Sequence, residues 1–459
     1  MPILIYAGLH LVLICLQQKD NAEKSGTPAP ACSTHRAVRP IEKVTHYECE
    51  RSAWSQTERR RCRTLARSRP NLVETQFYNR EICCTNRARS QDEGSKASVE
   101  MIRVLIVDDS AVIRRQLTDI LASDPKIVVA GTAGTGHLGL HRIAELKPDL
   151  VTLDVEMPGM DGLETLVEIR KLYPRLPVIM FSALTGPGAV ATVEALARGA
   201  SDYVAKPTQE GSPESASERV RLELVPKIKA LCAMRGPQHT PVPVATSVAS
   251  IARSPQRPTR VEVVAVGTST GGPNALGLLM PQFPKDFPVP IVIVQHMPAM
   301  FTQLLAARLD SLTQLHVQEA REGQRLLKGQ VWIAPGDYHM TVVRRGTDSV
   351  LSLNQSPPEN SCRPAVDVLF RTVVRAFGEN VLGVVLTGMG ADGTRGSAVI
   401  REAGGAVIAQ DEASSVVWGM PGSVVAAGLA ARICPLDGIV PEIVRRVSIF
   451  RTLASAAGG

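Results

Sequence analysis

The chain has 459 residues and a mass of 49.3 kDa, which at roughly 100 to 200 residues per domain predicts two or three domains and excludes a single small module. Hydrophobic residues make up 44% of the chain and charged residues 21%, so most of it can bury a core. The net charge of +7 is concentrated in the first 100 residues, where 16 Lys and Arg face 11 Asp and Glu, a surplus of five. The other 359 residues are nearly neutral, which argues against a nucleic-acid partner.

Cysteine spacing and the length of apolar runs exclude two further classes. Six of the nine cysteines lie in the first 100 residues, and the other three, Cys232, Cys362 and Cys434, are widely scattered. Scattered cysteines do not form a disulfide framework and fit a reducing cytoplasm. The longest apolar run, within residues 1–16, is shorter than the roughly 20 residues that span a bilayer. We therefore expect a cytoplasmic protein without membrane insertion.

Residues 1–100 differ from the rest of the chain. They show no sustained periodicity beyond residues 3–16, and they carry an arginine cluster at residues 59–63 amid polar residues. A clean apolar strand opens directly after Met101. We expect this segment to be a wrongly extended reading frame or a disordered tail, with Met101 as the natural start.

From Met101 the sequence alternates short apolar strands with helical segments. The expected strands cover residues 103–107, 128–131, 150–153, 178–181 and 202–204, and the expected helices cover residues 111–123, 138–146, 162–172, 189–198 and 215–234. Such alternation predicts an α/β fold, a doubly wound five-stranded parallel sheet with helices on both faces. Ligands of such sheets bind at the carboxyl ends of the strands.

Polar residues stand at these strand ends. The set comprises Asp108, Asp109, Asp154, Ser182 and Lys206. Each residue alone could be a strand-end cap or a turn residue, but five together favour a site. Converging carboxylates repel one another unless a cation lies between them, and a few hard oxygen ligands suit Mg²⁺. An aspartate beside that metal can accept a phosphoryl group, with the lysine and the hydroxyl as partners of the phosphate.

At these residues the segment resembles the receiver domain of two-component response regulators. The resemblance implies Asp154 as the phospho-accepting residue, with a histidine kinase as phosphodonor. It implies Mg²⁺ held by Asp108, Asp109, Asp154 and the backbone carbonyl of Glu156. Ser182, Lys206 and the aromatic Tyr203 match the switch positions of the family.

Residues 236–260 hold five prolines among Ser, Thr, Ala and Gln, a composition typical of a semi-extended linker. A β-branched strand at residues 261–266 then leads into a glycine-rich turn and a helix that starts near Pro273. Residues 267–271 satisfy the pattern G-x-S-x-G, which in this context exposes Ser269 on a sharp turn. A glycine-rich turn before a helix could instead cradle a phosphate.

Two further strand ends could complete a serine hydrolase site. The strand at residues 291–294 is followed by His296, and the strand at residues 381–386 is followed by Asp392. A serine nucleophile needs a base and a carboxylate that orients the base. A histidine after an apolar strand is more often structural and an aspartate beside a glycine can be a turn residue, so only the joint arrangement favours catalysis.

The second domain resembles the catalytic domain of chemotaxis protein-glutamate methylesterases, and the order receiver, linker, esterase resembles that whole family. The matching stretches are residues 267–272, 294–298, 363–370, 386–393 and 419–421. The resemblance implies Ser269 as nucleophile, His296 as general base and acid, and Asp392 as the orienting carboxylate. It also places Thr270 and Met389 at the site, where backbone amides are candidates for the oxyanion hole. It also implies demethylation of glutamyl methyl esters on the cytoplasmic helices of chemoreceptors, and in many members deamidation of receptor glutamines.

We therefore expect a receiver domain at residues 101–235, a linker at residues 236–260 and an α/β serine-hydrolase domain with a mostly parallel sheet at residues 261–455. The expected function is that of a phosphorylation-activated hydrolase without a cofactor in the esterase site. A transcriptional regulator would instead carry a helix-turn-helix and a basic surface after the receiver. A signalling scaffold without catalysis would not need the Ser, His and Asp set.

Overall fold

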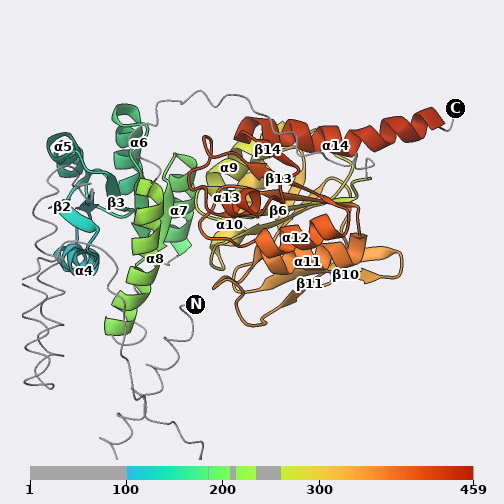
Figure 1. Cartoon of the computed structure of the whole chain (residues 1–459). Helices are drawn as coiled ribbons and strands as arrows, with labels where there is room; N and C mark the ends of the chain where they lie inside the picture. The colour runs from blue at the N-terminus through green and yellow to red at the C-terminus, as the bar shows by residue number, and fades with distance from the viewer. Residues whose placement is uncertain (1–100, 184–185, 207–212, 234–259, 458–459) are drawn as a thin grey trace, which may run out of the picture. The chain divides into compact units, whose positions relative to one another are not determined.

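The computed structural model describes residues 101–183, 186–206, 213–233 and 260–457 (Figure 1). The expected extension at residues 1–100 lies outside the described residues, and so does the Pro-rich linker except for Arg260. Residues 98–459 form one compact unit. No helix in the described part of the chain combines the length and apolar character needed to cross a membrane.

The first domain contains the predicted five-stranded sheet, and its strand order is β2-β1-β3-β4-β5. Every pairing in this sheet is parallel, which confirms the doubly wound fold. The strands are β1 (Ile102–Val107), β2 (Ile127–Ala133), β3 (Leu150–Asp154), β4 (Val178–Ser182) and β5 (Asp202–Ala205). The helices are α4 (Ala111–Ala122), α5 (Gly136–Leu146), α6 (Gly162–Leu172), α7 (Gly186–Ala197) and α8 (Pro213–Ala233).

The alternation of side chains along β1 shows why both faces of this sheet are covered. Val104 and Ile106 belong to an apolar cluster with residues of α4 and α8, whereas Leu105 and Val107 belong to a cluster with residues of α5, α6 and α7. Successive strand residues point to opposite faces, so a strand that is apolar at every position needs helices on both. The carboxylates Asp108, Asp109 and Asp154 accordingly stand at or just after the strand ends.

The second domain is built on a seven-stranded sheet with the order β14-β13-β12-β6-β7-β9-β8, in which all pairings are parallel. Its strands are β6 (Val263–Thr268), β7 (Ile291–Gln295), β8 (His316–Glu319), β9 (Gln330–Ile333), β12 (Val381–Val385), β13 (Ala406–Gln410) and β14 (Arg432–Cys434). A separate antiparallel hairpin consists of β10 (His339–Arg345) and β11 (Asp348–Asn354). The expectation of a mostly parallel α/β domain is confirmed.

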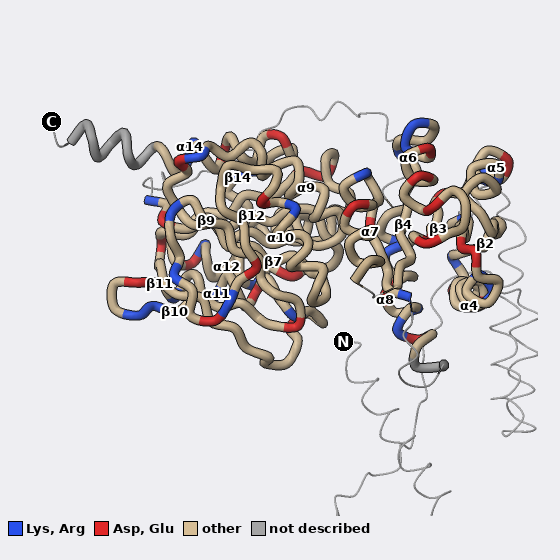
Figure 2. The backbone as a smooth tube through the Cα atoms, turned by 180° about the vertical axis from the view of Figure 1, so that it is seen from behind, with Lys and Arg blue, Asp and Glu red and all other residues tan. Residues whose placement is uncertain are grey.

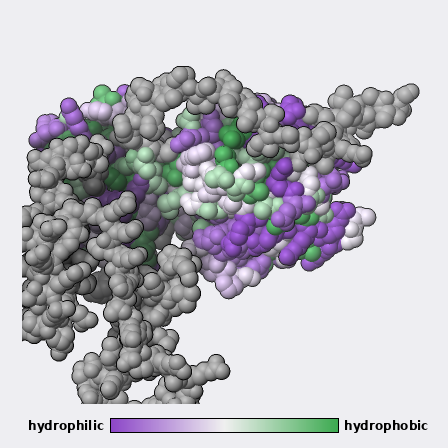
Figure 3. All heavy atoms as spheres, in the orientation of Figure 1, coloured by the Kyte–Doolittle hydropathy of each residue, from purple (hydrophilic) through white to green (hydrophobic). Residues whose placement is uncertain are grey.

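Helices cover both faces of this second sheet. The helical elements are α9 (Gly272–Leu279), the 3₁₀ helix η1 (Met280–Gln282), α10 (Phe301–Leu312), α11 (Val366–Phe377), α12 (Thr394–Glu402), α13 (Met420–Ala426) and α14 (Leu436–Ala457). Val263 and Ala265 of β6 pack with α11, α12 and α13, and Val264 and Val266 pack with α9, α10 and α14. The face over α11, α12 and the β10–β11 hairpin is mainly hydrophilic (Figure 3).

The two domains contact each other through α7 and β5 of the first and α9 and α10 of the second. Val193 and Tyr203 share one apolar cluster with Leu276 and Phe301. The rings of Tyr203 and Phe301 stack with centroids 4.8 Å apart. Acidic and basic positions are interspersed along the described parts of both domains (Figure 2), as the near-neutral charge predicts.

Candidate active site and phosphorylation site

The first domain gathers three carboxylates at the carboxyl edge of its sheet. Asp108 and Asp109 directly follow β1, and Asp154 is the last residue of β3. One ligand atom from each lies within 4.8 Å of the others. The Lys206 Nζ atom lies 2.7 Å from Asp154 Oδ2 and 3.2 Å from Asp108 Oδ2. The structure thus brings four of the predicted residues together.

Burial makes the charged forms of the carboxyl groups in this cluster unfavourable. Asp108 and Asp154 are each 1% exposed. Burial raises the pKa of Asp154 to about 6, because the hydrogen bond from Lys206 offsets the burial only in part and the neighbouring Asp108 charge adds to it. Burial likewise raises the pKa of Asp108. Two buried carboxylates and an exposed third, all oxygen donors, fit a small divalent cation such as Mg²⁺.

The other predicted receiver residues lie in β4, in β5 and in the loop after β3. Ser182 ends β4, and its Oγ lies 3.2 Å from the carbonyl oxygens of Ala183 and Gly188, to either of which it can donate. Glu156 lies in the loop after β3, where its amide donates to Asp154 Oδ1 at 3.3 Å. Tyr203 is buried in β5 against Phe301 of the second domain.

In the second domain Ser269 follows β6 on a tight turn. Gly271 at φ 79° adopts the left-handed conformation there, and a Cβ on it would lie 2.6 Å from Val416. Gly388 packs against the turn that carries Ser269, since a Cβ on Gly388 would lie 2.8 Å from the Cβ of Ser269. Glycine is therefore required at both positions, one for its backbone angle and one for close approach.

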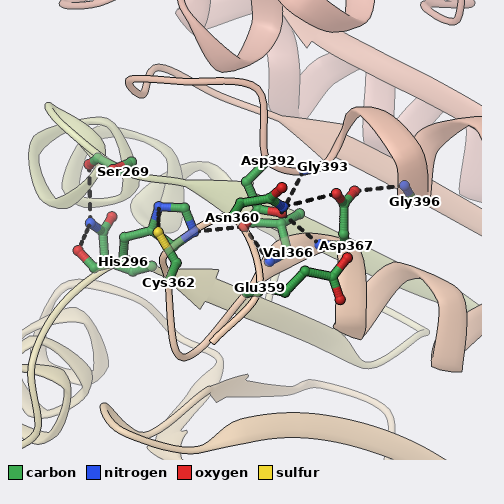
Figure 4. Close-up of polar contacts among 12 residues, drawn as sticks. Ser269, His296, Glu359, Asn360, Cys362, Val366, Asp367, Asp392, Gly393 and Gly396 are labelled. Carbon is green, nitrogen blue, oxygen red and sulfur yellow. Dashed lines mark hydrogen bonds and ion pairs between the residues drawn. The ribbon is translucent and has the colours of Figure 1, made fainter. Parts of the chain in front are cut away.

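His296 and Asp392 form a hydrogen-bonded pair at the carboxyl edge of this sheet. The His296 Nε2 atom lies 2.8 Å from Asp392 Oδ2. The other ring nitrogen, Nδ1, faces the Cys362 Sγ atom at 3.6 Å (Figure 4). Among the described contacts, Ser269 Oγ has no hydrogen bond to His296. The structure therefore pairs the predicted base with the predicted carboxylate and places a thiol at the other ring nitrogen.

Asp392 is held by five donors. Its Oδ1 accepts from Asn360 Nδ2 at 2.7 Å and from the amides of Asp367 and Gly393, and its Oδ2 accepts from the Val366 amide and from His296. Burial tends to raise the pKa of Asp392, but the His296 contact and these amides outweigh it and lower the pKa. The carboxylate is thus kept charged.

Burial disfavours the charged form of His296. The contacts with Asp392 and with Cys362 overcome that effect and raise the pKa of His296 to about 9. The imidazole in this arrangement is charged at neutral pH, whereas a general base must be neutral to accept a proton. In this arrangement His296 would have to lose a proton before it could act as the predicted base.

Ser269 and His296 line a cavity of about 600 Å³ that both domains enclose. Thr270 and Met389, which were also predicted to lie at the site, line the same cavity. The Thr270 hydroxyl donates to Asp202 Oδ2 of the first domain at 2.6 Å. The receiver residues that line it include Asp202, Tyr203, Arg219 and Lys227.

Sequence reasoning missed Asn360, Cys362 and the roles of Asp367 and Gln295. The Gln295 Nε2 atom donates to the carbonyl oxygens of Ser269 at 3.0 Å and His296 at 3.1 Å, so it joins the two turns. The position of Gln295 at the end of β7, next to His296, could have indicated that it belongs to the site. The loop with Asn360 and Cys362 lies outside any regular element, and nothing in its spacing indicates that it returns to Asp392.

A receiver domain joined to an α/β domain with Ser, His and Asp at one sheet edge defines a class of response-regulated hydrolases. The chain belongs to the CheB methylesterase family, which matches residues 264–443, and the response regulator receiver domain matches residues 104–215. This confirms the enzyme class and the two-component resemblance predicted from the sequence.

Individual relatives cover most of the chain. A protein-glutamate methylesterase/protein-glutamine glutaminase of Trichodesmium erythraeum is 51% identical over 347 residues, which is 75% of this chain and 99% of that protein. A protein of the same name from Nocardioides sp. is 50% identical over 78% of this chain and 98% of its own length. The crystal structure of the Thermotoga maritima CheB methylesterase catalytic domain is 41% identical, covers 41% of this chain and 99% of that one, and superposes with a TM-score of 0.40.

Proposed function

We propose that this chain hydrolyses glutamyl methyl esters on the cytoplasmic helices of chemoreceptors, that it acts in the cytoplasm, and that phosphorylation of Asp154 by a histidine kinase activates it. Glutamine side chains of the same receptors are a second substrate, because an amide and an ester offer the same acyl carbon. The names of the relatives at 51% and 50% identity support both substrates. The observation that carries the proposal is the His296–Asp392 pair at 2.8 Å in the cavity that Ser269 lines.

The chemistry follows from which ring nitrogen is available. Because Nε2 is bonded to Asp392, Nδ1 of His296 is the nitrogen that takes the proton of Ser269 Oγ. It can do so once it has separated from the Cys362 thiol and the imidazolium has released its Nδ1 proton to solvent. The serine oxygen then attacks the acyl carbon, and the imidazolium returns the proton to the departing methanol, or to ammonia from a glutamine. A water molecule, deprotonated by the same nitrogen, releases the acid and restores Ser269.

Control by the receiver is supported by the shared cavity and by the position of Ser182. A phosphoryl group on Asp154 adds up to about two negative charges and attracts Lys206 and the Ser182 hydroxyl. The hydroxyl now lies against Gly188 of α7, the helix that contacts α9 and α10. Movement of Ser182 toward the phosphate would release α7 and with it the contact between the domains.

A divalent cation fits the acidic cluster. Asp108, Asp109, Asp154 and the backbone carbonyl of Glu156 would hold Mg²⁺. Mg²⁺ would supply charge neutralisation for an incoming phosphoryl group. Lys206, which already contacts two of these carboxylates, would remain as the partner of the phosphate on Asp154.

The proposed nucleophile and base are tested by methanol release from methylated receptor membranes. We expect Ser269→Ala and His296→Gln each to lower the rate by about 10⁴-fold or more, and the double variant to be little worse than either, because triad members act as a unit. Asp392→Asn should cost less, since the serine and histidine remain. Substantial esterase activity in Ser269→Ala would place the nucleophile elsewhere.

A further inference from the structure

Asn360 lies between two buried carboxylates. Its Nδ2 atom donates to Asp392 Oδ1 at 2.7 Å and to Asp367 Oδ2 at 3.0 Å (Figure 4). We propose that Asn360 is a positioning residue for hydrolysis, which holds Asp392 in the orientation that supports His296. This inference rests on the proposed role of Asp392 in the reaction.

The direction of the amide is set by its neighbours. Ionised carboxylates only accept hydrogen bonds, so the nitrogen of Asn360 must face Asp392 and Asp367. The oxygen in turn accepts from Arg395 Nη2 at 2.8 Å. Arg395 also donates to Asp367 Oδ2 from Nε at 3.3 Å. Arg395 and Asn360 thus form one connected path from the surface to the buried carboxylate.

The two carboxylates need such a bridge. Asp392 is 3% exposed and Asp367 is not exposed at all. The Asp367 amide donates to Asp392 Oδ1 at 3.0 Å, which brings the two residues together at the start of α11. Asn360 supplies the one neutral side chain among the described contacts that donates to both, and so lowers their repulsion.

The remaining donors to Asp392 are different in kind. Apart from His296 and Asn360 they are backbone amides, which only a substitution by proline would remove. Besides His296, Asn360 is therefore the described donor to Asp392 that a change of side chain removes. The orientation of Asp392 should depend on it for this reason. An alternative is that Asn360 serves only its loop, because its φ of 53° lies in the left-handed region that asparagine tolerates better than most residues.

Two substitutions separate these roles. Asn360→Gly keeps the left-handed backbone and removes the amide, and Asn360→Asp keeps the shape but presents a third carboxylate. We expect Asn360→Gly to lower kcat for receptor methyl esters about 10- to 100-fold, the range of one hydrogen bond to a charged group, with KM changed less than about twofold. Asn360→Asp should be at least as slow. Ser361→Gly, at the neighbouring left-handed position with φ 61°, is the matched control for loop flexibility.

A double-mutant cycle gives the sharper readout. In an Asp392→Asn background, Asn360→Gly should cost less than about threefold, because the carboxylate that it positions is gone. Equal losses in both backgrounds, or a kcat of Asn360→Asp near that of the parent chain, would overturn the proposal. Ser269→Ala is measured in parallel: if it is inactive while Asn360→Gly is fully active, only the inference on Asn360 fails, and if Ser269→Ala is active the proposed mechanism itself fails.

Discussion

Asp202 of the receiver and Thr270, the residue after Ser269, share a buried hydrogen bond of 2.6 Å between Oδ2 and Oγ1. Asp202 begins β5, directly before Tyr203, and its other carboxylate oxygen lies 3.4 Å from the Lys227 Nζ atom. The strand that carries the receiver's aromatic switch position is therefore bonded to the turn that carries the proposed nucleophile. A shift of β5 would therefore act directly on Thr270, the residue next to Ser269.

Loss of this bond should weaken the restraint on the esterase. We expect Asp202→Ala to raise the rate of methanol release by the unphosphorylated chain by about 10- to 100-fold, because a buried hydrogen bond to a charged group contributes about 1.5–3 kcal/mol to the closed arrangement. Glu168→Ala, which removes an exposed carboxylate of α6 paired with Lys171, is the control and should leave the rate unchanged. A rate for Asp202→Ala at or below that of the parent chain would show that the contact does not restrain the site.

Asp154 should be the residue that takes up phosphate. Asp154→Asn removes the nucleophilic carboxylate but keeps its size, so labelling by radioactive acetyl phosphate should be abolished. Lys206→Ala should leave labelling detectable and reduce the increase in esterase rate that follows it, because the lysine stabilises the phosphorylated state. Undiminished labelling of Asp154→Asn would refute the assignment.

The pH dependence of the unphosphorylated enzyme should report the His296–Cys362 contact. With the pKa of His296 at about 9, the neutral base is scarce at pH 7, so kcat/KM should rise with pH through about 9. Cys362→Ala removes one of the groups that raise this pKa. The rising limb should therefore move to lower pH, and the rate at pH 7 should increase about 3- to 10-fold, for a pKa lowered by about half to one unit. If the rising limb of kcat/KM lies at the same pH in Cys362→Ala as in the parent chain, the thiol has no influence on the pKa of His296.

Periodicity and strand-end chemistry predicted much of this molecule. The apolar runs predicted both parallel sheets because strands buried on two faces need apolar residues at every position, as Val104 to Val107 illustrate. The placement of Asp154, Ser269, His296 and Asp392 at sheet edges followed from the same rule. Their catalytic and phosphorylation roles stay predictions.

Contacts made by loops and between domains could not be predicted from periodicity or from strand-end residues. Asn360 reaches Asp392 across 32 residues of sequence, and Asp202 reaches Thr270 across 68. Such contacts depend on the course of an irregular loop and on how two domains pack, and neither leaves a period in the sequence. The contact between Cys362 Sγ and Nδ1 of His296 could not be predicted for the same reason, because Cys362 also lies in that irregular loop.

The central claim is that the receiver restrains a receptor methylesterase and that phosphorylation removes the restraint. The most direct measurement is the rate of methanol release from methylated receptor membranes, with and without acetyl phosphate, for the full chain and for a fragment that starts at Arg260. We predict that acetyl phosphate accelerates the full chain, and that the fragment is faster than the unphosphorylated chain and does not respond to acetyl phosphate. A fragment no faster than the unphosphorylated chain would contradict restraint by the receiver and would point to activation through recruitment to the receptor.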